Sequence, residues 1–236
     1  MKLTIIGASG HGRVVADIAV LCGYEEVEFL DDDPSINNCG RWPVVGGSSL
    51  AQSVENDLFI AIGNAKIRKK MMEGSSDKKF PALIHPKAVV SPEAAVGSGT
   101  VVMAGAVVNP GARVGKGCII NTCASVDHDC MIEDFVHVSV GAHIAGAVRI
   151  GERTWIGAGA TVSNSIAISQ DCVIGAGAVV INDIEIKGVY IGMPARIMDK
   201  SKISWGGGDF SAHIMYNFGP SKAAVLYHGE QRRRGA

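Results

Sequence analysis

An aliphatic residue falls on every sixth position of the chain from Val90 to Ile186. A period of six fits neither an amphipathic helix, which repeats about every 3.6 residues, nor a single strand of ordinary length. It does fit a parallel β-solenoid made of hexapeptides, in which each hexad forms one short strand and one corner. Three hexads would then complete a coil, so that residues eighteen apart stack directly on one another.

Two further columns of residues support this register. The position two residues before each aliphatic residue is mostly small, so we expect both columns to point inward and form a narrow apolar core. The small column comprises Thr100, Ala106, Ala112, Cys118, Ala124, Cys130, Ala142, Thr154, Ala160, Cys172 and Ala178. Three residues after each aliphatic position stands a corner residue that is often glycine, which tolerates a left-handed backbone. The pattern resembles the left-handed parallel β-helix of the hexapeptide-repeat acyltransferases.

The residues before the repeats predict a small α/β domain. A buried strand over Lys2–Ile6 leads into a glycine-rich turn, and a helix over Val14–Leu21 and a strand over Val27–Leu30 follow. This order is typical of the first half of a Rossmann-like, parallel-sheet nucleotide-binding unit. The glycines at 7, 10 and 12 do not match the dinucleotide fingerprint, which argues against a nicotinamide cofactor. Amides at the helix N-terminus can still hold a phosphate, or the turn can be purely structural.

Two polar segments should meet at the carboxyl edge of this sheet. Asp31 and Asp32 end the second strand, and Gly63 and Asn64 follow a third strand over Leu58–Ile62. Ligands bind at this edge in open α/β sheets, and the acids can accept hydrogen bonds from a ribose or a base. A basic helix is expected next, over residues 66–72. We therefore divide the chain into an α/β domain over 1–80, a β-helix over 81–198 and a flexible tail over 199–236.

Composition narrows the classes of function. The 236 residues carry a net charge of −1, which argues against a nucleic-acid or anionic-membrane partner. No apolar run is long enough to span a bilayer, and the first residues are typical of a strand rather than a signal peptide, so we expect a cytoplasmic protein. Three of the six cysteines lie in the inward column, and Cys22, Cys39 and Cys123 lack metal-ligand spacing. No metal site is predicted.

Candidate chemistry lies at the one corner that departs most from glycine. Its residues are Asp127, His128 and Asp129. A corner histidine projects away from the apolar core, and a flanking carboxylate can orient its ring and stabilise the imidazolium, so His128 is the candidate general base. Eighteen residues later stands Gly146, which leaves room for a thioester and whose N–H can stabilise an oxyanion. The alternative is a solvent-exposed corner histidine without a role.

Other residues of the solenoid are weaker candidates for the active site. His137 lies half a coil from His128, so it could reach the same site only across a subunit boundary, or it is a plain surface residue. His143 carries less weight still. Glycine and alanine recur eighteen apart in residues 157–159 and 175–177, where they predict a corner with few side chains. An extended pantetheine arm could lie there.

Several segments together resemble the sugar N-acetyltransferases of bacterial nucleotide-sugar pathways, above all the enzymes that form UDP-N,N'-diacetylbacillosamine. GDP-perosamine N-acetyltransferases and sialic acid O-acetyltransferases are relatives. The resemblance spans roughly residues 1–198. The segments are residues 7–12 with the helix that follows, 29–32, 61–64, 67–70, 121–128, 135–141 and 192–195.

This resemblance implies a homotrimer whose active sites lie between neighbouring subunits, with acetyl-CoA as co-substrate and no metal. It implies a base at His128, assisted by Asp129, and an oxyanion amide at Gly146. The nucleotide sugar would contact Gly10, His11, Gly12, Asp31, Asp32, Gly63 and Asn64. Acetyl-CoA would contact His137, Gly146, Ala158, Gly159, Ala176 and Pro194. At Asp129 the bacillosamine enzymes tend to carry the longer Glu, whereas the perosamine enzyme carries an Asp.

The sequence therefore predicts acetyl transfer from acetyl-CoA to the C4 amine of a UDP-linked 4-amino-4,6-dideoxy sugar in a ternary complex. Alternatives within the class are a GDP-perosamine N-acetyltransferase and a sialic acid O-acetyltransferase. From other classes, a γ-carbonic-anhydrase-like metalloenzyme and a non-catalytic scaffold also use this solenoid. A metal assay and a thiol-release assay would separate them.

Overall fold

The structure is a computed structural model that describes residues 1–198, all within one compact unit. The tail expected over 199–236 lies outside the described residues. Neither helix of the described part has the length and apolar character needed to cross a membrane. The division at residue 80 stays a prediction, because the sheet-forming segment and the solenoid belong to that same unit.

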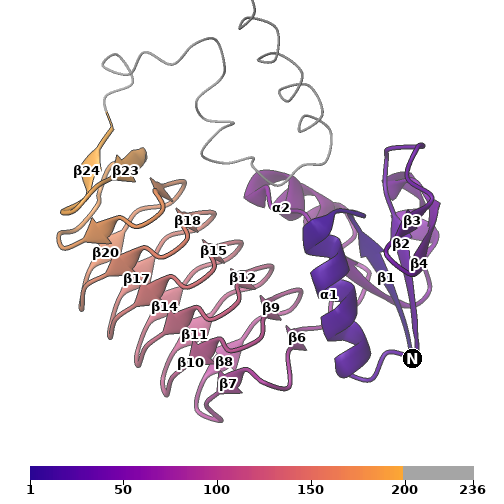
Figure 1. Cartoon of the computed structure of the whole chain (residues 1–236), viewed down its shortest axis with the longest axis horizontal. Coiled ribbons are helices and arrows are strands. Elements are labelled where there is room, and N and C mark those ends of the chain that lie inside the picture. Colours follow the sequence, from indigo (N-terminus) through magenta and orange to yellow (C-terminus); the bar gives the residue numbers. More distant parts are fainter. Residues whose placement is uncertain (199–236) are drawn as a thin grey trace, which may run out of the picture. The chain divides into compact units, whose positions relative to one another are not determined.

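The N-terminal part is a five-stranded sheet in the order β3-β4-β2-β1-β5 (Figure 1). Strands β1, β2, β4 and β5 run parallel, and β3 pairs antiparallel with β4. The strands are β1 (Lys2–Ile6), β2 (Glu26–Leu30), β3 (Asn38–Cys39), β4 (Trp42–Gly46) and β5 (Asp57–Ile60), and the helices are α1 (Gly10–Leu21), the 3-10 helix η1 (Ser48–Ser53) and α2 (Ala65–Gly74).

Helix α1 begins four residues earlier than the sequence predicts, which places His11 in its first turn. Close packing explains why this turn contains glycine. A Cβ on Gly12 would lie 2.0 Å from the Gly7 carbonyl oxygen, and Gly7 has a φ of +106°. The residue that follows β1 therefore packs directly against the first turn of the helix. Strands β3 and β4 were not expected, because Gly40 and Pro43 interrupt their short apolar pattern.

Three parallel sheets of short strands form the solenoid, whose coils stack in succession (Figure 1). One sheet contains β7 (Val89–Val90), β10 (Val107–Val108), β13 (Ser125–Val126), β16 (His143–Ile144), β19 (Thr161–Val162) and β22 (Val179–Val180). The second contains β8 (Ala95–Val96), β11 (Arg113–Val114), β14 (Met131–Ile132), β17 (Arg149–Ile150) and β20 (Ala167–Ile168). The third contains β6 (Leu83–Ile84), β9 (Val101–Val102), β12 (Ile119–Ile120), β15 (His137–Val138), β18 (Trp155–Ile156), β21 (Val173–Ile174), β23 (Val189–Ile191) and β24 (Arg196–Ile197), the last pair being antiparallel.

The predicted register is confirmed through most of the solenoid. Strand partners are eighteen residues apart, as in the pairs Val101 with Ile119 and His137 with Trp155. Every member of the small column is buried, together with the aliphatic column from Val102 to Val180. These two inward columns form one continuous apolar core.

The repeat is wrong at its last position, because Ile186 is 68% exposed. Ile168 pairs with Ile184, and Val173 pairs with Val189, so the last coil is shortened to a spacing of sixteen residues. Ile184 is buried in the core cluster. An aliphatic residue stands at both 184 and 186, so the sequence period alone could not reveal the shortening.

The corner column adopts the left-handed backbone at every hexad from 99 to 177. Seven of these corners carry a side chain, and for each of them this conformation costs about 1 kcal/mol relative to glycine. The non-glycine corners are Cys123, Asp129, Phe135, Ala147, Arg153, Ser165 and Asp171. The candidate catalytic corner at Asp129 belongs to this set.

Candidate active site

His128 lies on the corner between β13 and β14, where two carboxylates hold it. Its backbone N–H donates to Asp127 Oδ1 at 2.7 Å, and its ring Nδ1 lies 2.9 Å from Asp129 Oδ2. Asp127 is fixed in turn by the amide of Asn109 from the preceding coil, at 2.7 Å. Because both the backbone and the ring are tied down, the imidazole is oriented before any substrate binds.

These carboxylates also set the protonation of the corner. The hydrogen bond to Asp129 raises the pKa of His128, and the charge of Asp127 adds to this effect. The Asn109 amide and the His128 N–H lower the pKa of Asp127, so that carboxylate stays ionised. His128 is exposed and remains accessible to a substrate. A histidine with a raised pKa is a stronger base once it is deprotonated.

Gly146 packs directly against the His128 ring. A Cβ at this position would lie 2.4 Å from His128 Nε2, so only glycine fits beside the undisturbed imidazole. The Ala147 N–H donates to the His128 carbonyl at 2.9 Å, which couples the two coils. Within residues 1–198 the Gly146 N–H has no acceptor. A free backbone donor beside a base is the arrangement that an acyl-transfer oxyanion requires.

The N-terminal segments meet at the carboxyl edge of the sheet, as the topology predicts. Asp31 Oδ2 accepts from the Ala8 N–H at 2.7 Å, and Asp32 accepts from the N–H and hydroxyl of Ser48 at 2.7 and 2.9 Å. Both acids therefore brace the loops of this edge. Gly63 is exposed with open space where a Cβ would stand. Gly10, in the first turn of α1, is equally open.

Asn64 is the N-cap of α2. Its side-chain oxygen accepts from the Lys66 and Ile67 N–H groups at 3.0 and 3.2 Å. Asn64 therefore has a structural role as a helix cap, and its contact with the acceptor stays a prediction.

His11 carries an unusual buried nitrogen. Its Nε2 is buried and finds no hydrogen-bond partner within residues 1–198. Burial lowers the pKa of His11 to about 4, and the charge of Arg68 contributes to the decrease. The ring is therefore neutral at physiological pH, with an unsatisfied polar atom at the predicted acceptor edge.

Burial lowers the pKa of His137 well below the usual value, and the charge of Arg68 adds to this effect. Its ring stacks on Trp155, with 5.6 Å between centroids and 3° between planes. Its Nε2 is 3.2 Å from the Asn121 amide nitrogen, and Asn121 Oδ1 accepts from Thr122 N–H. This orientation makes the amide the donor, so Nε2 accepts and the neutral ring carries its proton on Nδ1.

The two histidines thus occupy different parts of the chain's surface. His128 is on the β13–β14 corner, whereas His137 is in β15 beside the α1 loop. Sequence reasoning did not identify Arg68 as a site residue and did not include Asn121 and Trp155 among the site residues. Trp155 stands eighteen residues after His137, so the repeat itself contained the signal for their contact.

The surface predicted for acetyl-CoA is open. Nothing lies within 4 Å of where a Cβ would stand on Gly159 or on the stacked corners Gly141 and Gly177. Ala158, Ala176 and Pro194 are exposed. The His143 ring has its Nδ1 2.9 Å from Ser125 Oγ on the neighbouring strand β13. Within residues 1–198, no group of three or more histidine, cysteine or acidic side chains has the arrangement of a metal site.

The fold and the corner site define the class of protein. Residues 2–74 match the family of PglD N-terminal domains. The whole described fold is similar to the acetyltransferase domain of PglB from Neisseria gonorrhoeae, with 43% identity, a TM-score of 0.81, and coverage of 84% of this chain and 99% of that one. The structure of this Neisseria domain has also been solved in complex with acetyl coenzyme A.

Two further comparisons agree. PerB from Caulobacter crescentus, solved with CoA and GDP-perosamine, is 36% identical with a TM-score of 0.80 over 84% of this chain and 98% of that one. The UDP-N-acetylbacillosamine N-acetyltransferase of Bacillus subtilis is 38% identical over 111 residues, which cover 44% of this chain and 51% of that relative. The aligned part thus spans about half of the Bacillus protein. The chain belongs to the family of left-handed β-helix sugar N-acetyltransferases with a PglD-type N-terminal domain.

Proposed function

We propose that this protein transfers the acetyl group of acetyl-CoA to the C4 amine of a UDP-linked 4-amino-4,6-dideoxy sugar. The observation that carries the proposal is the His128 corner, where an oriented, accessible imidazole stands beside the free N–H of Gly146. The 38% sequence identity over 111 residues to a UDP-N-acetylbacillosamine N-acetyltransferase supports the choice of acceptor.

In the proposed reaction, His128 Nε2 removes a proton from the acceptor amine while the nitrogen attacks the thioester carbonyl. The Gly146 N–H stabilises the negative charge that develops on the carbonyl oxygen. The carbon–sulfur bond then breaks, the acetyl group remains on nitrogen, and CoA leaves as the thiolate. Asp129 stabilises the imidazolium formed in the first step. A positioned base of this kind contributes about 10²- to 10⁴-fold.

The N-terminal edge supplies the acceptor half of the proposed site. Gly10 and Gly63 offer open backbone to a ligand, whereas Gly12 is buried against the Gly7 carbonyl and fixes the start of α1. Asp31 and Asp32 hold the surrounding loops. The smooth corners at Gly159 and Gly177 would accept the pantetheine arm. Because His128 and His137 occupy different sides of one solenoid, a site that contains both requires a second subunit. The family resemblance implies that the assembly is a homotrimer with sites between subunits.

A GDP-linked amino sugar is the second candidate acceptor, because PerB, solved with GDP-perosamine, is similar over 84% of this chain. The resemblance described above also implies an Asp at this position in the perosamine enzymes, as at Asp129 here. A sialic acid acceptor would keep the same base and change the accepting atom to oxygen. The alternatives from other classes, a zinc-dependent hydratase and a non-catalytic scaffold, are disfavoured by the similarity to acetyltransferases over 84% of this chain.

Thiol release from acetyl-CoA by the purified full chain tests these choices. The acceptors would be UDP- and GDP-linked 4-amino-4,6-dideoxy sugars, CMP-sialic acid and serine. We expect rapid release with the UDP-linked amino sugar. Release only with another acceptor would refute the substrate, and silence across the panel would refute acetyl transfer. Metal content, measured on the same preparation, tests the zinc alternative.

A further inference from the structure

Arg68 of helix α2 is the largest fully buried side chain of the described residues, with 1% of its surface exposed. Its guanidinium donates to carbonyl oxygens on both sides of the contact between the sheet and the solenoid. Nη1 contacts Ile62 O and Gly63 O at 2.6 and 3.0 Å. Nε contacts Gly117 O at 2.6 Å, and Nη2 contacts Phe135 O at 2.8 Å. One side chain therefore joins the sheet edge to two stacked corners.

No carboxylate within residues 1–198 forms an ion pair with this guanidinium. The titratable group that faces it, besides His11 and His137, is the thiol of Cys118, whose pKa burial raises to about 12. Burial lowers the pKa of Arg68 itself to about 10, so the residue stays protonated at neutral pH. Four carbonyl dipoles alone compensate the charge. Buried charges often stabilise a protein no more than apolar residues of similar size do. Holding the sheet against the solenoid therefore does not by itself explain a buried arginine at this position.

The four carbonyls belong to two parts of the molecule, the sheet edge proposed to hold the acceptor and the solenoid beside His137. Ile62 and Gly63 directly follow β5 at the carboxyl edge of the sheet. Phe135 stands two residues before His137, at the corner from which β15 begins. The guanidinium therefore sets the separation between the Gly63 loop and the solenoid strand that carries His137.

Its charge reaches both nearby imidazoles. The Arg68 cation lowers the pKa of His11 and of His137, in each case after burial as the main cause. Both rings are kept neutral, and each then offers one N–H donor and one acceptor rather than two donors. The tautomer of His137 set by Asn121 depends on this neutrality.

Resting on the proposed function, we propose that Arg68 is a positioning residue that holds the Gly63 loop at the working distance from His137, and that acceptor binding depends on it. Misplacement of a bound substrate by about 1 Å can reduce the rate about 10²-fold.

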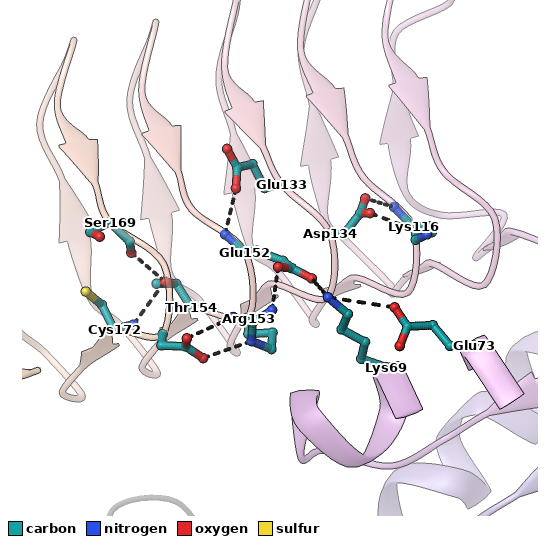
Figure 2. A network of polar contacts seen from close by, with 11 residues as sticks. Lys69, Glu73, Lys116, Glu133, Asp134, Glu152, Arg153, Thr154, Ser169 and Cys172 are labelled. Atoms are coloured by element: carbon teal, nitrogen blue, oxygen red, sulfur yellow. Dashed lines mark hydrogen bonds and ion pairs between the residues drawn. The ribbon is translucent and has the colours of Figure 1, made fainter. Parts of the chain in front are cut away.

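The neighbouring residue provides a matched control. Lys69, next in α2, also reaches the solenoid, but through an ion pair with Glu152 at 2.7 Å on the accessible rim (Figure 2). Glu152 is bonded in turn to Arg153, which pairs with Asp171 at 2.8 Å. Removing this contact leaves the four hydrogen bonds from Arg68 to carbonyl oxygens intact. Lys69→Met therefore weakens the contact between α2 and the solenoid without moving the Gly63 loop.

The experiment measures steady-state kinetics of Arg68→Met, Arg68→Lys and Lys69→Met with acetyl-CoA and the UDP-linked 4-amino-4,6-dideoxy sugar. For Arg68→Met we expect the KM for the sugar to rise about tenfold or more and kcat/KM to fall about 10²-fold, with the KM for acetyl-CoA within about twofold of wild type. Lysine has three donors on one atom and cannot span four carbonyls, so Arg68→Lys should show the same defect. Lys69→Met should leave both KM values within about twofold.

Histidine NMR titration of the full-length wild-type chain supplies a readout that needs neither a variant nor turnover. We expect neither His11 nor His137 to titrate near the ordinary value of about 6.5. Arg68→Met should raise the pKa of both rings, whereas Arg68→Lys should keep them low.

Three outcomes would overturn the proposal. One is a wild-type KM for the sugar in either Arg68 variant. Another is a loss of active protein with both KM values unchanged, which would indicate only a structural role. The last is an ordinary titration of His11 or His137 in the wild type, a result that counts even if the variants fail to fold. Absence of turnover in the wild type would refute the proposed function alone, because the titration is read without it.

Discussion

At the scale of the residue, the proposed chemistry rests on two carboxylates that hold one imidazole. Asp127 binds the backbone of His128 and Asp129 binds its ring, so the two acids have separate roles. Asp129 can make its contact because it occupies a left-handed corner, with a φ of 59°. Aspartate tolerates that conformation better than most residues, which explains how a corner of this kind can carry a functional side chain.

Asp129→Asn should shift the pH profile toward acid. Asp129 raises the pKa of His128, and the neutral imidazole is the active base, so activity is present above that pKa and lost as the pH falls through it. Removing the carboxylate lowers the pKa and moves the acidic limb of kcat/KM to lower pH. The plateau should also fall, about tenfold or more, because the imidazolium loses its partner. Asp77→Asn, at an exposed ion pair far along the chain, is the control.

An unchanged acidic limb in Asp129→Asn would contradict the proposed pairing.

His128→Ala should lose about 10²- to 10⁴-fold in turnover while acetyl-CoA binding, measured by calorimetry, persists. Near-normal turnover in that variant would refute the base.

Gly146→Ala tests the contact between neighbouring coils. The new Cβ would stand 2.4 Å from His128 Nε2 and would displace the ring. We expect at least a tenfold loss of kcat, with the loss of stability limited to about 1 to 3 kcal/mol because the clash lies at an exposed side chain. Gly74→Ala has no atom within 4 Å of its Cβ and should behave as wild type. Activity and thermal unfolding would be measured together, and an active Gly146→Ala enzyme would refute the predicted crowding.

At the scale of the element, the strands of the solenoid are too short to be stable alone and depend on stacking. Each strand except β23 contributes two residues to a ladder whose inward columns are buried. The last coil keeps this core although it is shorter than the others, because Ile184 takes the inward place. The cost of a mutation should therefore follow the observed register rather than the sequence period.

Ile174 and Ile186 form a matched pair for testing that register. Both belong to the six-residue aliphatic column, but Ile174 is 0% exposed and Ile186 is 68% exposed. Ile174→Ala should lower the free energy of unfolding by about 2 to 5 kcal/mol. Ile186→Ala should change it by no more than about 0.5 kcal/mol. Equal costs, measured by denaturant unfolding, would place Ile186 in the core and refute the shortened coil.

At the scale of the whole molecule, the proposal requires more than one copy of the chain. Within one solenoid, His128 and His137 lie on different sides, and only His137 lies beside the N-terminal edge. A site that contains both therefore needs a neighbouring subunit. This requirement leads to a test of assembly that is independent of substrate identity.

Complementation between two inactive variants tests the shared site. If each site takes His128 from one subunit and His137 from the next, co-expressed His128→Ala and His137→Ala chains should regain about one quarter of the wild-type activity in random trimers. Each variant expressed alone is the control and should be inactive. Sedimentation should show a trimer throughout. Trimers without regained activity would refute the shared site, and a monomer would refute the assembly.

The sequence by itself determined the features that depend on local spacing. The six-residue period, the small inward column and the corner positions specify the β-helix, because each hexad repeats the same backbone conformation and needs only its stacked neighbours. The same spacing identified His128 as the unusual corner and Gly146 as its neighbour one coil later. Strand–turn–helix order likewise predicted the first parallel strands and the edge at which Asp31 and Gly63 meet.

Only the tertiary structure decided the features that join distant segments. The burial of Arg68 among four carbonyls has no local signal, since a basic residue on a helix is ordinarily exposed. The proximity of His11 and His137 depends on how α1 and the Gly63 loop pack on the solenoid, which periodicity does not specify. The shortened last coil was equally hidden, because aliphatic side chains stand at both 184 and 186 and only long-range pairing chooses between them.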